Sequence, residues 1–118
     1  MKKIVLVDDY ADYTETLKDF IERFNDAQCV TFSNPNDALL YVLENKEEVD
    51  ILLTDYEMPQ MNGFSLASKL LEEKLKIRII VSSGHSKQTL DKICKHYDLE
   101  NKIELTTKGD LEILMHLA

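Results

Sequence analysis

Short aliphatic runs alternate with helical stretches along the whole chain, and this alternation limits the possible folds more than any other feature. Five runs have the length and residue types of buried strands: 4–7, 29–32, 51–54, 79–82 and 103–107. Parallel neighbouring strands need a crossover connection, which is usually a helix. The sequence therefore predicts an α/β fold, a doubly wound five-stranded parallel sheet with helices on both faces.

The segments between the runs carry apolar residues at helical spacing. The first of them places Tyr13, Leu17, Phe20, Ile21 and Phe24 on one stripe, which predicts a helix lying against the sheet. Asn34 followed by Pro35 is typical of a helix N-terminus. Further helices are expected over 65–74, 87–97 and, shorter, 110–117. A chain of 118 residues has the size of one domain, so we expect a single domain over 1–118.

Composition narrows the function classes. A net charge of −8, from 14 basic and 22 acidic residues, repels a phosphate backbone and disfavours direct binding of nucleic acid. The apolar runs are far too short to cross a membrane, so we expect a cytoplasmic protein with no membrane association. Cys29 and Cys94 lack metal-like spacing and are expected to be buried, reduced thiols.

Acidic residues follow two of the predicted strands directly. Asp8 and Asp9 end "IVLVDD", and Asp55 ends "DILLTD". In the strand order 2-1-3-4-5 these strands are neighbours, and ligands of such sheets bind at the carboxyl ends of the strands. Two like charges about 4 Å apart repel by about 4 kcal/mol at an effective dielectric constant near 20, so the cluster needs a proton or a cation. Oxygen ligands favour Mg²⁺, with Mn²⁺ as the alternative.

Two further strands end in polar side chains at the same edge. Ser82 and Ser83 end the fourth strand in "IIVSSGHS", and Lys108 follows the fifth in "IELTTKGD". A carboxylate nucleophile, a metal ion, a hydroxyl donor and an ammonium group together suit the transfer of a phosphoryl group onto an aspartate.

These motifs resemble the receiver domain of two-component response regulators, which has the flavodoxin-like, CheY-like fold. The matching pieces are "VDD" at 7–9, "TDYEMPQMNG" at 54–63, "SSGH" at 82–85 and "TK" at 107–108. The resemblance covers essentially the whole chain. It implies a phosphoryl-accepting signalling switch that receives its phosphoryl group from a histidine kinase or a histidine phosphotransfer protein and then changes its binding to a downstream protein. Such a protein is not an enzyme in the usual sense, because it catalyses only its own phosphorylation and dephosphorylation.

The resemblance also implies a role for each matching residue. Asp55 is the expected phosphoacceptor, and Asp9 a direct metal ligand. The remaining roles are a partly water-mediated metal ligand at Asp8, a metal-binding backbone carbonyl at Glu57, the hydroxyl switch at Ser83 and the phosphoryl-pairing lysine at Lys108. Glu57 and His85, which lies two residues after Ser83, are candidates for tuning the lifetime of the aspartyl phosphate.

Three departures from the family pattern lie near the C-terminus. Gly109 follows Lys108 where the family usually has proline in a cis peptide bond, so the resemblance does not determine the local backbone path. Leu105 replaces the usual Tyr or Phe, which predicts muted or differently coupled switching. The Ser83 to Lys108 segment is slightly long and the last helix slightly short, which leaves the usual output face, formed by the fourth helix, fifth strand and fifth helix, undetermined.

Other interpretations remain open from the sequence. Each aspartate could be a helix cap or turn residue, and Ser83 and Lys108 could be ordinary surface groups. His85, His96 and His116 show no metal-like spacing. The competing functions are a degenerate receiver that acts only as a protein-interaction domain, a phosphohydrolase with an aspartyl nucleophile and a flavodoxin-like cofactor carrier. A phosphohydrolase of this kind would need a cap domain, for which this chain has no room. A flavodoxin-like carrier is disfavoured because Asp8 and Asp9 would repel a flavin phosphate.

Overall fold

The computed structural model describes all 118 residues as an alternating series of strands and helices. The five strands are β1 (Lys2–Val7), β2 (Ala27–Phe32), β3 (Ile51–Asp55), β4 (Arg78–Ser83) and β5 (Glu104–Thr107). The helices are α1 (Ala11–Phe24), α2 (Pro35–Glu44), α3 (Gly63–Glu72), α4 (Lys87–His96) and α5 (Leu111–Met115). No helix is both long and apolar enough to span a bilayer.

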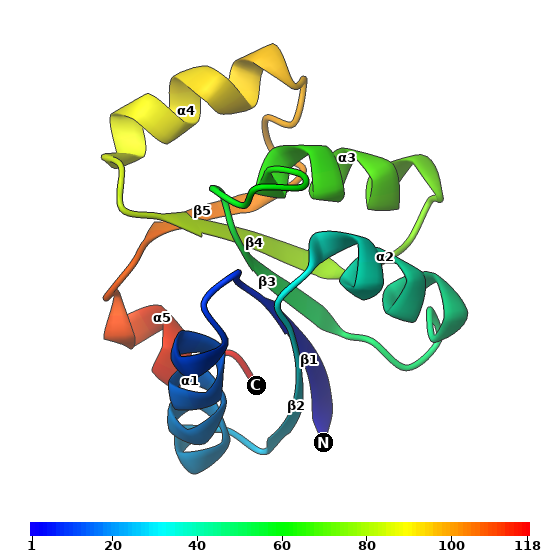
Figure 1. Cartoon of the computed structure of the whole chain (residues 1–118), viewed down its shortest axis with the longest axis vertical. Coiled ribbons are helices and arrows are strands. Elements are labelled where there is room, and N and C mark those ends of the chain that lie inside the picture. The colour runs from blue at the N-terminus through cyan, green and yellow to red at the C-terminus, as the bar shows by residue number, and fades with distance from the viewer.

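All strand pairs are parallel, and the sheet order is β2-β1-β3-β4-β5. The predicted fold class and strand order are therefore confirmed. Helices α1 and α5 cover one face of the sheet, and α2, α3 and α4 cover the other (Figure 1). Strand order reverses at β1, which pairs with β2 on one side and β3 on the other. In sheets of this kind the reversal point is where ligands bind.

Each face of the sheet has its own hydrophobic core. The larger core holds 16 buried residues beneath α2, α3 and α4, with Phe64 fully buried. The smaller holds 10 buried residues beneath α1 and α5. Every residue of β3 is buried because the strand has packing on both faces, which explains its unbroken aliphatic run.

Local sequence sets most helix ends. Asn34 caps α2 by accepting a hydrogen bond from the Asn36 amide, with Pro35 in the first turn as predicted. The α3 prediction was displaced by two residues, because Asn62 caps the helix by accepting from the Ser65 amide and Lys74 at the far end has a φ of 58°. Cys29 and Cys94 are buried free thiols, as expected.

The C-terminal end of the fold is small and depends on side-chain contacts. Helix α5 has five residues, fewer than the predicted 110–117. The Asn25 amide donates to the carbonyl oxygens of Ile21 (2.9 Å) and Leu114 (2.8 Å), and its oxygen accepts from the Ala118 amide (3.0 Å). Asn25 therefore joins the end of α1 to the end of the chain.

Candidate functional site

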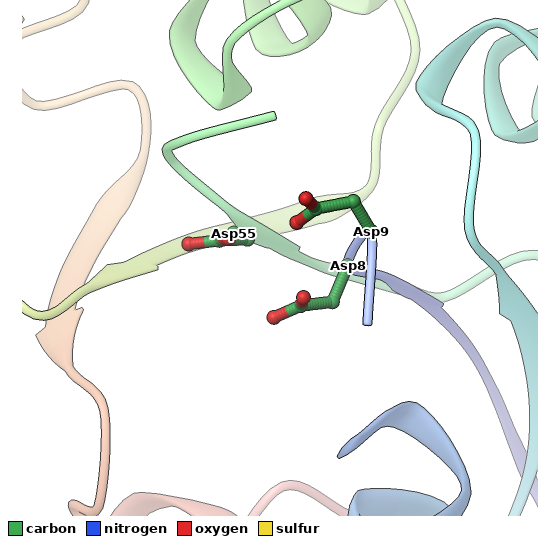
Figure 2. A group of neighbouring side chains, drawn as sticks. All are labelled: Asp8, Asp9 and Asp55. Atoms are coloured by element: carbon green, nitrogen blue, oxygen red, sulfur yellow. The ribbon is translucent and has the colours of Figure 1, made fainter. Parts of the chain in front are cut away.

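Three carboxylates meet at the carboxyl ends of the two central strands. Asp55 is the last residue of β3, while Asp8 and Asp9 follow β1, whose Val7 lies opposite Thr54. Each aspartate offers an oxygen within 4.8 Å of the others. Figure 2 shows the side chains of Asp8 and Asp9 directed from the end of β1 toward the side on which Asp55 lies. The structure thus brings together the three acids that the sequence placed at this edge.

Burial raises the free-energy cost of keeping these clustered carboxylates ionised. Asp8 is 2% exposed and Asp55 is 6% exposed, and Asp9 is half-buried. Burial raises the pKa of Asp55 above its ordinary value, the neighbouring charge of Asp8 raises it further, and Lys108 opposes both effects. The Tyr10 amide donates to Asp8 Oδ1 at 3.0 Å. A cation between the carboxylates would stabilise their ionised form.

Lys108 lies in the loop after the edge strand β5, and its side chain reaches Asp8 and Asp55. Its Nζ lies 3.1 Å from Asp8 Oδ2 and 3.3 Å from Asp55 Oδ2. Its backbone amide donates to the Ser83 carbonyl oxygen at 2.9 Å, which ties the loop to the end of β4. All peptide bonds are trans, and Gly109 has a φ of 91°, a conformation that glycine adopts without a steric penalty. The loop after β5 therefore places the Lys108 side chain beside Asp8 and Asp55, although glycine follows the lysine in place of proline.

The two serines at the end of β4 have different surroundings, although the sequence placed both at the rim. Ser83 is 1% exposed and lines the cleft with Asp55, and its hydroxyl accepts from the His85 amide at 3.0 Å. Ser82 borders a separate hollow on the α1 and α5 side. Successive strand residues point to opposite faces, so only Ser83 accompanies the carboxylates.

Glu57 and His85 form the outer wall of the cleft. Glu57 Oε1 and His85 Nε2 contact each other, and both side chains are largely exposed. The His85 ring also meets Tyr56 edge-on, with centroids 6.3 Å apart. Both residues line the open cleft of about 720 Å³ that contains Asp9, Asp55, Ser83 and Lys108. The metal-binding role of the Glu57 carbonyl stays a prediction.

Three residues that shape the site were given no separate role from the sequence, although Asn62 and Gly63 stand inside the quoted motif at 54–63. A Cβ on Gly63 would lie 2.5 Å from the Asp55 carbonyl oxygen, so only glycine fits there. Asn62 lines the cleft and donates from its side-chain amide to the Tyr97 hydroxyl at 2.7 Å. Tyr13, interpreted only as part of an apolar helix stripe, has its ring centroid 5.0 Å from Lys108 Nζ. The Asn-Gly pair was a usable turn signal, whereas nothing in the local sequence pairs Tyr13 with Lys108.

The donor set fits a hard divalent cation. It consists of carboxylate oxygens close enough to share one ion, with two of the three side chains deeply buried. Mg²⁺ is usually held by one or two carboxylates and keeps several waters. An open cleft on one side leaves room for those waters and for a phosphoryl group.

The fold and the site define a class, a parallel α/β domain with an acidic, lysine-bearing cleft at its strand-order reversal. The model of the response regulator receiver domain family matches residues 4–104. This chain therefore belongs to that family.

Individual relatives agree with this assignment. The chain is 35% identical over 85 residues to the transcriptional regulatory protein NatR of Bacillus subtilis, a match covering 72% of this chain and 36% of NatR. It is 31% identical over 72 residues to a chemotaxis protein CheY homolog of Campylobacter jejuni, covering 61% and 55%. The chain thus spans only part of the curated relatives that it matches.

Solved structures agree on the fold. A response regulator receiver domain protein from Clostridium thermocellum superimposes with a TM-score of 0.82 at 22% identity, over 98% of this chain and 91% of that one. The chemotaxis protein CheY4 of Vibrio cholerae gives a TM-score of 0.80 at 18% identity, over 98% and 93%.

Proposed function

We propose that this receiver domain is a signalling switch in which Asp55 accepts a phosphoryl group from a phosphohistidine on a histidine kinase or a histidine phosphotransfer protein. The observation that carries the proposal is the convergence of Asp8, Asp9 and Asp55 with Lys108, which contacts both Asp8 and Asp55 at the sheet edge. The protein acts in the cytoplasm and catalyses only its own phosphorylation and dephosphorylation.

The transfer is a nucleophilic substitution at phosphorus. A carboxylate oxygen of Asp55 attacks, an O–P bond forms, the P–N bond to the donor imidazole breaks, and the imidazole nitrogen keeps the electron pair. Burial of Asp55 restricts its solvation, and Lys108 lies close enough to move from the carboxylate to a phosphoryl oxygen. The Ser83 hydroxyl, which lines the same cleft as Asp55 and Lys108, can donate to a second phosphoryl oxygen.

Asp8, Asp9 and Asp55, with the Glu57 backbone carbonyl, would hold Mg²⁺, or Mn²⁺ in its place, and this ion would supply positive charge at the transferring group. Three carboxylates and one lysine leave a net negative site, so the charge is needed to admit a phosphoryl group. Asp8 already accepts from Lys108 and from the Tyr10 amide, which favours partly water-mediated binding there.

Glu57 and His85 are proposed to tune how long the phosphoryl group lasts. Their contact lies at the wall of the open cleft that contains Asp55, so the two side chains occupy space through which water could approach the carboxylate. Replacing both by smaller side chains opens that path and is expected to shorten the phosphorylated lifetime. The proposed downstream partner is a protein that responds to the added charge in the cleft, which Ser83, Gly84 and His85 line just before α4.

The direct experiment is intact mass measurement after incubation with acetyl phosphate and Mg²⁺. The expected result is an increase of one phosphoryl group that disappears in Asp55→Ala and in the presence of a chelator. An unmodified wild type that also fails to bind Mg²⁺ would contradict the proposal and favour a degenerate receiver that acts only as an interaction domain.

A further inference from the structure

Lys108 is the one group of the site that follows the edge strand β5. Its backbone is fixed by the hydrogen bond to Ser83, but Gly109 follows it directly with a φ of 91°. Glycine leaves a loop more conformational freedom than other residues do. The lysine side chain itself has several rotatable bonds, and holding it still costs conformational entropy. The contacts of the ammonium group with Asp8 and Asp55 offset part of this cost, and a further side-chain contact would offset more of it.

Tyr13 supplies such a contact. It lies in the first turns of α1, on the face that packs toward the sheet, and is half-buried. Its ring centroid is 5.0 Å from Lys108 Nζ, within the range in which a cation is attracted to an aromatic face. Tyr13, Lys108 and Gly109 also border the same small hollow between α1 and the loop after β5.

The ammonium group has three close neighbours. Its Nζ lies 3.1 Å from Asp8 Oδ2 and 3.3 Å from Asp55 Oδ2, and the ring of Tyr13 is the third neighbour. The contact with Lys108 is made by the ring of Tyr13. Burial raises the pKa of this phenol, so the ring stays neutral at physiological pH.

We propose that Tyr13 is a positioning residue for Lys108 in phosphoryl transfer, its ring holding the ammonium group over Asp55 through a cation–π contact. The inference rests on the proposed function, since it assigns a role within the same reaction. It goes beyond the family pattern because the contact joins the first helix to a loop in which glycine has replaced proline. A pre-placed ammonium group needs no reorganisation when negative charge develops at the phosphoryl oxygens.

The experiment compares variants that keep the ring with variants that keep only apolar volume. Tyr13→Phe retains the ring face, whereas Tyr13→Leu and Tyr13→Met fill the space without it. We expect Tyr13→Phe to take up a phosphoryl group from acetyl phosphate within about twofold of the wild-type rate, and the other two to be slower by about threefold to tenfold. Thermal midpoints establish that each variant is folded.

A spectroscopic readout separates positioning from packing. The ε-methylene protons of Lys108, assigned by their loss in Lys108→Ala, should show an upfield ring-current shift in wild type and Tyr13→Phe. This shift should disappear in the Leu and Met variants.

Three results would overturn the inference while leaving the proposed function intact. They are an unchanged rate in the Leu and Met variants, an unchanged Lys108 shift in those variants, or failure of both to fold while Tyr13→Phe folds, which would make the role structural. A wild type that takes up no phosphoryl group would overturn the proposed function and this inference together.

Discussion

The strand ends that carry the three aspartates and the loop that carries Lys108 serve one cleft but are held in different ways. Strand β3 lies at the centre of the sheet and is buried throughout. Strand β5 has one neighbour, and of its four residues only Thr106 is buried. The family match ends at residue 104, at the start of β5. The acidic half of the site is therefore positioned by the core, whereas the basic half is positioned by one backbone hydrogen bond to Ser83 and by contacts of the Lys108 side chain.

Truncating one buried side chain to alanine should lower the free energy of unfolding by different amounts in the two cores. Phe64 is fully buried beneath the acidic strand ends, stacking near Tyr56 and Tyr97 at centroid distances of 5.1 and 5.5 Å. We expect Phe64→Ala to lower the free energy of unfolding by about 3–5 kcal/mol. Leu114→Ala, in the short α5, should lower it by about 2–3 kcal/mol, because that site is nearer the surface and can collapse more easily.

Urea unfolding of both variants at one pH measures the comparison. Equal losses for Phe64→Ala and Leu114→Ala would show that α5 is as firmly packed as α3 and would contradict the expectation.

Two glycines test the acidic strand ends directly. A Cβ on Gly63 would lie 2.5 Å from the Asp55 carbonyl oxygen and 3.2 Å from Tyr56 Cα, both backbone atoms. We expect Gly63→Ala to cost about 1–3 kcal/mol and to slow phosphoryl uptake, because β3 must shift to make room. Gly84→Ala is the matched control, since a Cβ there has no atom within 4 Å, and should change stability by less than about 0.5 kcal/mol.

Gly109 tests the loop that carries Lys108. Its φ of 91° strains any residue with a side chain, although a Cβ there would have open space around it. We expect Gly109→Ala to cost about 1–2 kcal/mol and to slow phosphoryl uptake through displacement of Lys108. A variant that is destabilised but takes up phosphoryl groups at the normal rate would show that the Lys108 side chain is held independently of the loop backbone.

The smallest expected effect concerns the pairing of β5 with β4. Arg78 donates to both carboxylate oxygens of Glu104, at 2.5 and 2.7 Å, and this pairing lowers the pKa of Glu104. A lowered folded-state pKa gives stability that is present above the ordinary value of 4.5 and lost as the pH falls through the folded value. Because both side chains are over a third exposed, we expect Glu104→Gln to cost at most about 1 kcal/mol at pH 7.

Urea unfolding at pH 7 and pH 3 measures this difference, which should shrink at the lower pH. Glu47→Gln, which removes an exposed carboxylate outside any salt bridge, controls for net charge. The same pH response in both variants would assign the effect to overall charge and not to the pair.

The fold and the acidic part of the site could be predicted because their signals are local. The strand runs, the helix stripes and the aspartates directly after two strands depend on short stretches of sequence, and parallel topology then brings the strand ends together. The role of Lys108 was assigned by motif, but the path of its loop depends on the positive φ of Gly109, which no sequence pattern specifies. Ser83 was assigned by motif, and side-chain alternation along β4 separates it from Ser82, which borders the hollow on the other side of the sheet.

The contact of Tyr13 with Lys108 could not have been predicted, because it joins residues far apart in the sequence and uses a side chain that already had a sufficient explanation as core. Helix α5 was predicted too long for a related reason. Leu117 is buried as a helix residue would be, but it is held there by the chain end that Asn25 ties down.

That tie has a practical consequence for labelling. Met1 and Ala118 border the same surface hollow, beside Lys2 and Asp26. This hollow lies where β1 begins, at the opposite end of that strand from the aspartates. Fluorophores placed on the two ends would sit close together, so their energy transfer would report detachment of the C-terminal residues from Asn25. A short peptide bridge could equally join the ends into a circular permutant with new termini in the loop after β4, placing a reporter beside the cleft.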